Sequence, residues 1–285
     1  MPDASTRTAA MENGEVMYGA YGAIPNIDAV RLREMDGFSV TTDGYAMINP
    51  MALIEFNTTK PPFDNPAMRR AVSLVMLSSN FDKVGLYKSG LPNYPASGDL
   101  EAAIKELDDA GIMPDANGVR ASITLDLIPY GEDWRRAGEY MKQAMKPLGI
   151  EVELRYEDVP TWLNRIYAEY DFEMNVNYFY QLPDPVLGVH RHYGTDQIRQ
   201  GTHFVNSSRY SNPELDALLA SGAQEPDAAK RAEIYGQIQT ILATDMPVAN
   251  LFEMEFLTVY NDKLAGHATS AMGAYGSFEN ASVSE

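Results

Sequence analysis

The sequence contains no cysteine, which excludes disulfide bonds, thiolate metal sites and a cysteine nucleophile. This absence does not fix the compartment, because an oxidising space permits disulfides without requiring them. Basic residues are also scarce: 22 Lys and Arg stand against 40 Asp and Glu, a formal net charge of −18. A protein that neutralises nucleic-acid phosphates or docks on anionic lipid by charge needs the opposite balance. We therefore expect no nucleic-acid partner.

Long apolar runs are missing as well. The longest, Ala71–Leu77, is interrupted by Ser73 and is far short of the ~20 apolar residues that span a bilayer. The first residues, Met1–Arg7, are polar and contain no apolar signal region. If the protein begins at Met1, these residues predict that it is not exported. If the sequence is part of a longer chain, they give no information about export. Hydrophobic residues still make up 45% of the chain, enough to bury a substantial core.

Common catalytic and cofactor motifs are absent too. There is no Gly-x-Ser-x-Gly elbow, no Gly-x-Gly-x-x-Gly and no Gly-Lys-Ser/Thr loop. His190 and His192, with Asp184 nearby, raise the alternatives of a metal site or a hydrolase. No third ligand stands at helical spacing to complete a metal site, and no residue set fills the catalytic roles together. We expect histidines on the surface or lining a cleft, and no metal, cofactor or catalytic residues.

The middle of the chain alternates between two hydrophobic periods. Strand-like alternation and helical three-and-four spacing succeed one another in this order: Val119–Ile128, Trp134–Leu148, Ile150–Leu154, Thr161–Tyr170 and Phe172–Phe179. Strands separated by helices at this spacing predict an α/β fold with parallel strand pairing.

Further elements flank this unit. Helices are expected at Ile27–Met35, with Ile27, Val30, Leu32 and Met35 as its apolar face, and at Ala67–Leu77, Leu100–Ala110, Asn212–Ser221 and Asp227–Thr244. Asp64 or Asn65 would cap the second of these helices, with Pro66 at its first position. Leu182–Asn212 reads as a long irregular stretch, and such stretches inside compact domains are usually functional or mobile. Val248–Tyr260 is predicted to be a strand pair.

Two features suggest a ligand site. Tyr178, Phe179 and Tyr180 end a predicted strand, and ligands commonly bind at the carboxyl ends of such strands. Side chains alternate along a strand, so at least one of the three must line a cleft or cover a loop. The alternative is that they pack beneath the Leu182–Asn212 stretch. Glu253 lies inside the apolar run Leu251–Phe256, so its carboxylate is either ion-paired or directed at a ligand.

Several blocks, taken in order, resemble one family. Phe56–Asp64 followed by Arg69–Val72 is similar to the "FN…PPF-D…R-A" block of the bacterial extracellular solute-binding proteins, family 5. These are the oligopeptide, dipeptide and nickel receptors of ABC importers. The resemblance covers nearly the whole chain. The other matching blocks are Ser5–Val16, Gly149–Val152, Asp171-Phe172, Asp184-Pro185, Asn212–Asp216, Arg231–Gln239 and Asp245–Pro247.

The resemblance implies an α/β, periplasmic-binding-protein-like fold (type II, large cluster). It implies a second lobe at 56–250, with closing elements of the first lobe at 1–55 and 251–285, the latter including the hinge return. It also implies a non-enzymatic, periplasmic, monomeric receptor. Such a receptor would capture a small solute, a peptide or peptide-like molecule, between two lobes and deliver it to an inner-membrane ABC permease.

The resemblance also implies site residues. Aligned on Asp184-Pro185, the family's cleft aromatic falls on Tyr178 and its acidic position on Gln181. A neutral amide cannot pair with a ligand's amino group as a carboxylate does, although it can still form hydrogen bonds. Phe179 and Tyr180 keep a stacking surface. The expected ligand-binding residues are Tyr178, Phe179, Tyr180, Gln181, Asn57 and Glu253.

Two departures from the family shape these expectations. The family's chains are longer, so this one would hold only part of the first lobe, and we expect weak or no ligand binding by the chain alone. The connection Lys83–Tyr94 is also shorter than usual. Two alternatives stay open: a hydrolase or other enzyme using the His190/Asp184 region, and a non-functional fragment of a disrupted receptor gene.

Overall fold

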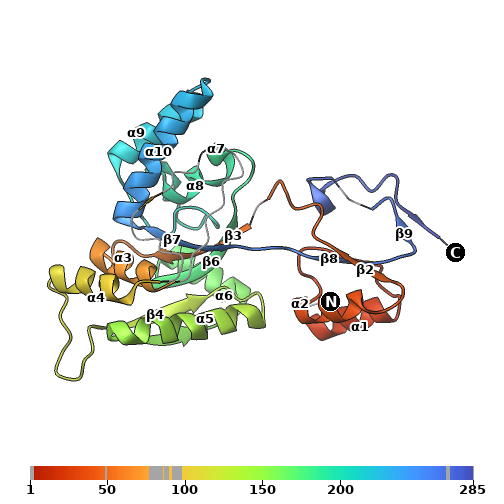
Figure 1. Cartoon of the computed structure of the whole chain (residues 1–285), viewed down its shortest axis with the longest axis horizontal. Helices are drawn as coiled ribbons and strands as arrows, with labels where there is room; N and C mark the ends of the chain where they lie inside the picture. Colours follow the sequence, from red (N-terminus) through yellow and green to blue (C-terminus); the bar gives the residue numbers. More distant parts are fainter. Residues whose placement is uncertain are drawn as a thin grey trace. The chain divides into compact units, whose positions relative to one another are not determined.

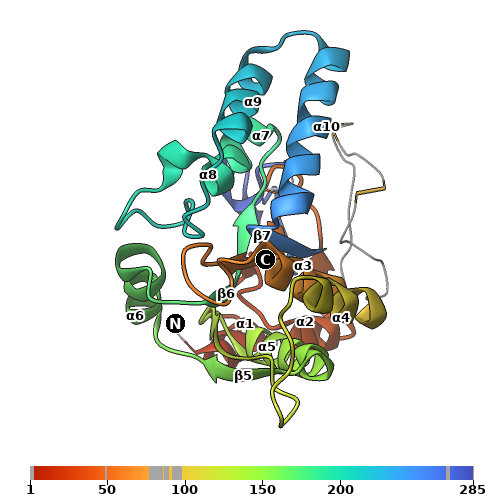
Figure 2. The ribbon, with the colours of Figure 1, turned by 90° about the vertical axis from the view of Figure 1, so that its left-hand side faces the viewer.

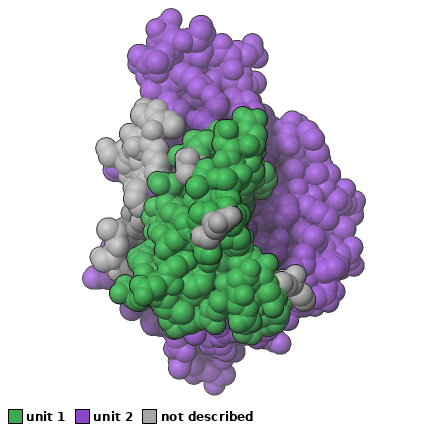
Figure 3. All heavy atoms as spheres, turned by 90° about the vertical axis from the view of Figure 1, so that its right-hand side faces the viewer, with its two compact units in different colours: residues 1–50, 254–285 green, residues 51–253 purple. Residues whose placement is uncertain are grey.

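The computed structural model describes residues 3–48, 50–76, 86, 90–91, 98–267 and 270–284. The predicted short connection at 83–94 lies almost wholly outside these residues. The chain forms two compact units, shown in different colours in Figure 3. The larger is Met51–Glu253, and the smaller combines Met1–Pro50 with Met254–Glu285. The boundaries expected at 55/56 and 250/251 fall inside strands β3 (Pro50–Phe56) and β7 (Val248–Glu253).

The larger unit is built on a five-stranded sheet with the order β5-β4-β6-β3-β7. Strand β4 (Ala121–Leu127) pairs in parallel with β5 (Ile150–Arg155) and with β6 (Met174–Tyr180), which confirms the predicted α/β unit. At the other side of the sheet β3 and β7 pair antiparallel, with Met51 opposite Glu253. The carboxyl ends of β4, β5 and β6 therefore share one edge of the sheet.

Helix α5 (Glu132–Met145) packs on one face of this sheet, against β4 and β5. Its buried residues, Trp134, Gly138, Met141 and Met145, recur at the helical spacing that predicted it. Helix α3 (Pro66–Val75) contacts α4 (Leu100–Asp109) and α5. As predicted, Asn65 caps α3 by accepting from the amide of Ala67, with Pro66 at the first position.

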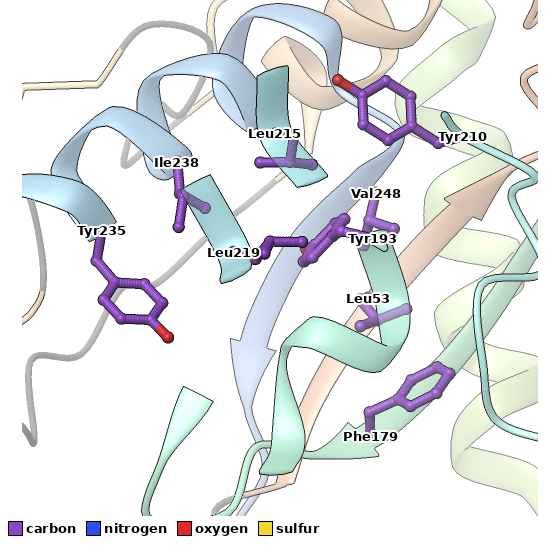
Figure 4. Close-up of a cluster of buried hydrophobic side chains, with 9 residues drawn as sticks. All are labelled: Leu53, Phe179, Tyr193, Tyr210, Leu215, Leu219, Tyr235, Ile238 and Val248. Atoms are coloured by element: carbon purple, nitrogen blue, oxygen red, sulfur yellow. The ribbon is translucent and has the colours of Figure 1, made fainter. Parts of the chain in front are cut away.

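The opposite face of the sheet is covered by the rest of the larger unit. Helices α9 (Pro213–Gln224) and α10 (Ala228–Asp245) lie side by side, as Figure 2 shows. A hydrophobic core fills the space between them and the sheet, drawn in Figure 4. It joins Leu53 on β3, Phe179 on β6, Val248 on β7, Tyr193, Tyr210, Leu215, Leu219, Tyr235 and Ile238.

The Leu182–Asn212 stretch is more ordered than its sequence predicts. It holds three short helices: α7 (Pro185–Gly188), α8 (His190–Tyr193) and η3 (Thr195–Gln197). The helix expected at Thr161–Tyr170 divides into α6 (Val159–Leu163) and a π-helical segment, η2 (Asn164–Glu169). A short η1 (Lys146–Leu148) closes α5. π-Helical turns often occur at functional positions.

The smaller unit contains a three-stranded sheet with the order β1-β8-β2. Its strands are β1 (Tyr18–Gly19), β2 (Phe38–Thr41) and β8 (Thr258–Asn261). Helices α1 (Ala4–Glu12) and α2 (Asn26–Arg33) bury Met11, Ala29 and Leu32 with Val259. The pair β9 (Leu264–Ala265) and β10 (Ser282–Val283) and the turn η4 (Gly273–Tyr275) complete this unit, traced in Figure 1.

Two predictions for these segments were wrong. The strands expected to pair within Val248–Tyr260 belong to different sheets, because β7 pairs with β3 and β8 pairs with β1 and β2. The apolar face predicted for 27–35 is wrong at three of its four positions: Ile27 is 79% exposed, Val30 56% and Met35 39%, whereas Leu32 is buried as predicted. The second buried residue of this helix is Ala29. Within the described part of the chain, no helix combines the length and apolar character of a membrane span.

Candidate ligand-binding site

Four aromatic side chains gather where β4 and β6 end and α5 begins. We call Tyr130, Trp134, Tyr178 and Tyr180 the aromatic cluster. The rings of Trp134 and Tyr178 stack, with centroids 5.7 Å apart and planes 14° apart. The ring centroids of Tyr130 and Tyr180 lie 6.1 Å and 6.0 Å from that of Tyr178. Trp134 is buried, Tyr178 and Tyr180 are half-buried, and Tyr130 is exposed. The cluster thus presents a ring surface at the carboxyl edge of the parallel strands.

Alternation along β6 separates the three consecutive aromatics. Tyr178 and Tyr180 belong to the aromatic cluster, whereas Phe179 points to the opposite face and is buried in the core with Leu53 and Tyr193. Its ring lies 3.8 Å from that of His192. Two interpretations of this run were open, a ligand-facing role and packing beneath the 182–212 stretch. Phe179 packs inside, whereas Tyr178 and Tyr180 lie at the strand edge, and their ligand-facing role stays a prediction.

The α7–α8 turn holds the strand end in place. Arg191 donates from Nη2 to the carbonyl of Tyr180 (2.9 Å) and from Nε to that of Gly188 (3.2 Å). Gly188 lies so close that a Cβ there would fall 1.6 Å from the carbonyl oxygen of Gln181. The next residue, Leu182, takes a left-handed backbone with φ of 57°. Strained non-glycine backbone persists only where surrounding contacts impose it, and such residues cluster at ligand-binding positions.

The side chain of Asn57 has a structural role. It is completely buried and donates from Nδ2 to the carbonyls of Tyr170 and Phe172, both at 3.0 Å. Its Oδ1 accepts from the amide and the hydroxyl of Thr59. Both donors and the carbonyl oxygen are therefore occupied within the chain. The structure does not bring Asn57 together with the aromatic cluster.

Glu253 ends β7, where it stands opposite Met51 in the register of the sheet. It is half-buried, so the apolar run around it does not enclose the carboxylate as completely as its sequence suggests.

Sequence reasoning missed a buried polar network on the other face of β6. Glu55 on β3 is 2% exposed. Its Oε2 accepts from Asn175 (2.8 Å) and Asn177 (3.1 Å), and its Oε1 accepts from the hydroxyl of Ser207 (2.6 Å). Burial raises the pKa of Glu55 from its ordinary value of 4.5 to about 7. A usable signal was present: Glu55 lies between Ile54 and Phe56, the same pattern that singled out Glu253.

The network continues into the π-helical segment. Asn177 also donates to the hydroxyl of Tyr167 on η2 (3.0 Å), and the indole of Trp162 donates to Oδ1 of Asn175 (3.0 Å). Burial raises the pKa of Tyr167 well above its ordinary value. Asn177 Oδ1 accepts from the amide of Tyr178 (2.8 Å), so the network contacts the aromatic cluster through one residue.

In the His190/Asp184 region both side chains have partners within the chain. Nε2 of His190 forms a hydrogen bond with the hydroxyl of Tyr235 (2.8 Å), and Asp184 pairs with Arg231 (2.8 Å) and caps α7 through the amide of Val186. His192 is buried against Phe179, not at the surface or in a cleft as predicted, and burial lowers its pKa well below the ordinary value. Among the residues the structure describes, no cluster of His, Cys, Asp or Glu could hold a metal ion.

Solved structures identify the fold as that of a periplasmic binding protein. The chain matches over its full length a structure of the binding protein AgaA from A. tumefaciens in complex with agropinic acid (TM-score 0.82, 18% identity, 60% of that chain). It matches equally completely DppA from Helicobacter pylori in complex with the peptide STSA (TM-score 0.81, 19% identity, 56% of that chain).

Sequence comparison identifies the family. The model for bacterial extracellular solute-binding proteins, family 5 Middle, matches residues 1–199, and the chain belongs to this family. Protein XP55 of Streptomyces lividans is 31% identical over 183 residues, which cover 61% of this chain and 32% of that protein. Di/tripeptide-binding protein 2 of Pseudomonas aeruginosa is 24% identical over 262 residues, which cover 87% of this chain and 48% of that protein. The chain thus spans less than half the length of these two relatives.

Proposed function

We propose that this chain is part of the substrate-binding component of an ABC importer, a receptor that captures a peptide or peptide-like solute and passes it to an inner-membrane permease. Membership of family 5 and the periplasmic-binding-protein fold support this role. The observation that carries it is the aromatic cluster at the carboxyl edge of β4 and β6, where α/β sheets commonly bind ligands.

The proposed ligand contacts are Tyr178, Tyr180 and Gln181. The two tyrosine rings would stack on apolar groups of the solute, and the Gln181 amide would exchange hydrogen bonds with a peptide backbone. Glu253 stays a candidate for a cationic group of the ligand. Phe179 and Asn57 are left out of this site, because one is packed in the core and the other has its hydrogen-bonding groups occupied by the fold.

We infer a periplasmic location from relatives such as the periplasmic oligopeptide-binding protein OppA of Haemophilus influenzae, 24% identical over 275 residues. We also infer that the receptor acts as a monomer, without enzymatic activity and without a cofactor. The hydrogen bonds of His190 and Asp184 within the chain give no support to a hydrolase.

The test is a binding titration followed by NMR, which detects the weak affinity expected of this chain alone. A ¹⁵N-labelled sample is titrated with a panel of di-, tri- and tetrapeptides up to millimolar concentration. Peptide-dependent shifts are expected at the amides of Tyr178–Gln181. They should be lost in Tyr178→Ala and kept in Tyr140→Ala, which removes an exposed tyrosine of α5. Shifts confined to other regions, or shifts at Tyr178–Gln181 that Tyr178→Ala leaves unchanged, would count against the proposal.

A further inference from the structure

The buried carboxylate of Glu55 joins three parts of the larger unit. Glu55 lies on β3, its partners Asn175 and Asn177 lie on the neighbouring β6, and Ser207 lies in the segment 204–208. Through Asn177 and Asn175 the same network reaches Tyr167 on η2 and Trp162 on α6. All five of these residues are buried, and Glu55 is the acid at the centre of the network.

The hydrogen-bonding groups around Glu55 fit both of its protonation states. The carboxylate form accepts three hydrogen bonds, from two amides and one hydroxyl. In the protonated form the two amide donors can keep Oε2, while Oε1–H donates to Ser207 Oγ at the same 2.6 Å separation. Only the Ser207 hydroxyl has to reverse, because a hydroxyl is both donor and acceptor. The structure therefore holds a proton at Glu55 without rearranging heavy atoms.

Among the described residues, Glu55 takes part in no ion pair with a cation. A second acid, Asp126 on β4, stands opposite Asn175 in the register of the sheet and is paired with Arg155 of β5 (2.6 Å). The groups that face the network are Tyr167 on η2, which lies near Arg191 of α8, and His203, whose ring is 5.8 Å from that of Tyr167. On β7, Val248 stands opposite Glu55 and carries no charge. A buried charge without a partner is costly.

The segment that Ser207 anchors is bordered by strained backbone. Phe204 and Arg209 both take left-handed conformations, with φ of 58° and 56°. Two further hydrogen bonds hold the segment. The hydroxyl of Ser208 donates to the carbonyl of Pro247 (3.1 Å), and the amide of Thr58 donates to the carbonyl of Ser208 (3.0 Å). Non-glycine residues keep this backbone only while such contacts impose it.

We propose that Glu55 is a proton-operated latch. Its protonated form holds the 204–208 segment and the π-helical η2 on the sheet, whereas its ionised form keeps the hydrogen bonds but is a buried charge without a paired cation among the described residues, and the cost of that charge favours loosening of both. Burial places the pKa of Glu55 at about 7, so the latch would change state around neutral pH. The change would also reach the aromatic cluster, because Asn177 accepts the amide of Tyr178. This inference goes beyond ligand capture, and it holds or fails without any ligand.

The chain's two tryptophans allow a direct test. Trp162 donates into the network, whereas Trp134 stacks on Tyr178 on the opposite face of the sheet. In Trp134→Phe, emission therefore reports Trp162 alone. We expect it to change between about pH 5 and about pH 9, with a midpoint near the value that burial gives Glu55. Glu55→Gln in the same background mimics the protonated acid and should abolish the transition.

His203 is the matched control, because it is the histidine that faces Tyr167. His203→Gln in the Trp134→Phe background should keep the transition. A transition that survives Glu55→Gln, one that disappears with His203→Gln, or emission that stays flat in Trp134→Phe would overturn the proposal.

Hydrogen exchange tests the loosening itself. After correction for the intrinsic pH dependence of exchange, the amides of 204–208 should exchange at least about tenfold faster above the transition than below it in the wild-type chain, and at equal rates in Glu55→Gln. Equal rates in the wild-type chain would overturn the latch. If Glu55→Gln fails to fold, ¹³C-carboxyl NMR of the wild-type chain decides: one Glu resonance should titrate near neutrality, and ordinary acidic titration of every Glu would refute the proposal.

Discussion

The indole of Trp134 lies parallel to the ring of Tyr178, with centroids 5.7 Å apart and only 14° between their planes. Trp134 lies in the first turn of α5 and Tyr178 near the end of β6, so the stack joins a helix to the strand that carries the proposed ligand contacts. Aromatic pairs in such offset geometry contribute about 0.5–1.5 kcal/mol beyond the area they bury.

Removing this stack should destabilise the larger unit. We expect Tyr178→Ala to lower the free energy of unfolding by roughly 2 kcal/mol, from the lost pair and the lost burial of a half-buried ring. Urea denaturation measures the change, and Trp134 emission in a Trp162→Phe background should shift as the indole loses its neighbour. Tyr140→Ala on the exposed side of α5 should cost no more than about 0.5 kcal/mol. Equal costs for the two tyrosines would contradict the stacked geometry.

Stability should fall as the pH rises towards neutrality. The pKa of Glu55 is about 7 in the folded protein and ordinarily 4.5, so between these values the folded protein binds more protons than the unfolded chain. The free energy of unfolding then decreases with rising pH, by roughly 3 kcal/mol across the whole window. Urea denaturation of the wild-type chain and of Glu55→Gln at several pH values measures this effect, as the pH dependence of the difference between their free energies of unfolding. A difference that does not change with pH would show that Glu55 has the same pKa in both states.

Asn57→Ala should be strongly destabilising. The substitution leaves the buried carbonyls of Tyr170 and Phe172 without their donors, and each unsatisfied group costs about 1–3 kcal/mol. We expect a loss of roughly 3 kcal/mol in thermal or urea unfolding. Asn117→Ala, in an exposed turn beside Asp115, is the matched control and should change stability by less than about 0.5 kcal/mol. If Asn57→Ala folded with wild-type stability, the hydrogen bonds of its side chain would not stabilise the fold.

Gly188→Ala tests how tightly the end of β6 is held. A methyl group at Gly188 would lie 1.6 Å from the carbonyl oxygen of Gln181. Because this oxygen belongs to the backbone, only a backbone shift can remove the clash. We expect a loss of roughly 3 kcal/mol, with amide shifts at Tyr180–Leu182 in NMR spectra. Val186→Ala, on the exposed side of the same helix, should leave both nearly unchanged. Shifts that spare Tyr180–Leu182 would mean that the turn does not position the strand.

The sequence predicts the larger unit well where period and position agree. Strands β4, β5 and β6 and helix α5 follow from alternation and from three-and-four spacing, because each buries one regular face. The short helix α2 shows the limit of the same reasoning. It offers several apolar residues at helical spacing, and the fold buries Ala29 and Leu32 and leaves Ile27 in solvent. Which side of a short helix is buried depends on tertiary contacts that its own residues do not encode.

The position of the aromatic cluster could be predicted only in part, for a similar reason. A strand end rich in aromatics is visible in sequence, and alternation correctly implied that Tyr178, Phe179 and Tyr180 could not share one environment. The Glu55 network was not foreseen, because its members come from positions as far apart as 55 and 207. Their asparagines and serine have no individual signature. The burial of a carboxylate can be suspected from apolar neighbours, but its partners emerge only from the topology of the sheet.

The chain enters the larger unit on β3 and leaves it on the adjacent β7, where Met51 and Glu253 stand opposite one another. This antiparallel pairing sets an order of assembly. In the sheet of the smaller unit β2 pairs with β8, and the hydroxyl of Ser39 donates a hydrogen bond to Asp262, a residue 223 positions later in the sequence. Closing so long a loop in an unfolded chain costs conformational entropy, which a folded larger unit removes by bringing the two ends together. The smaller unit should therefore fold second, and segment 51–253, whose ends already meet, should fold when expressed alone.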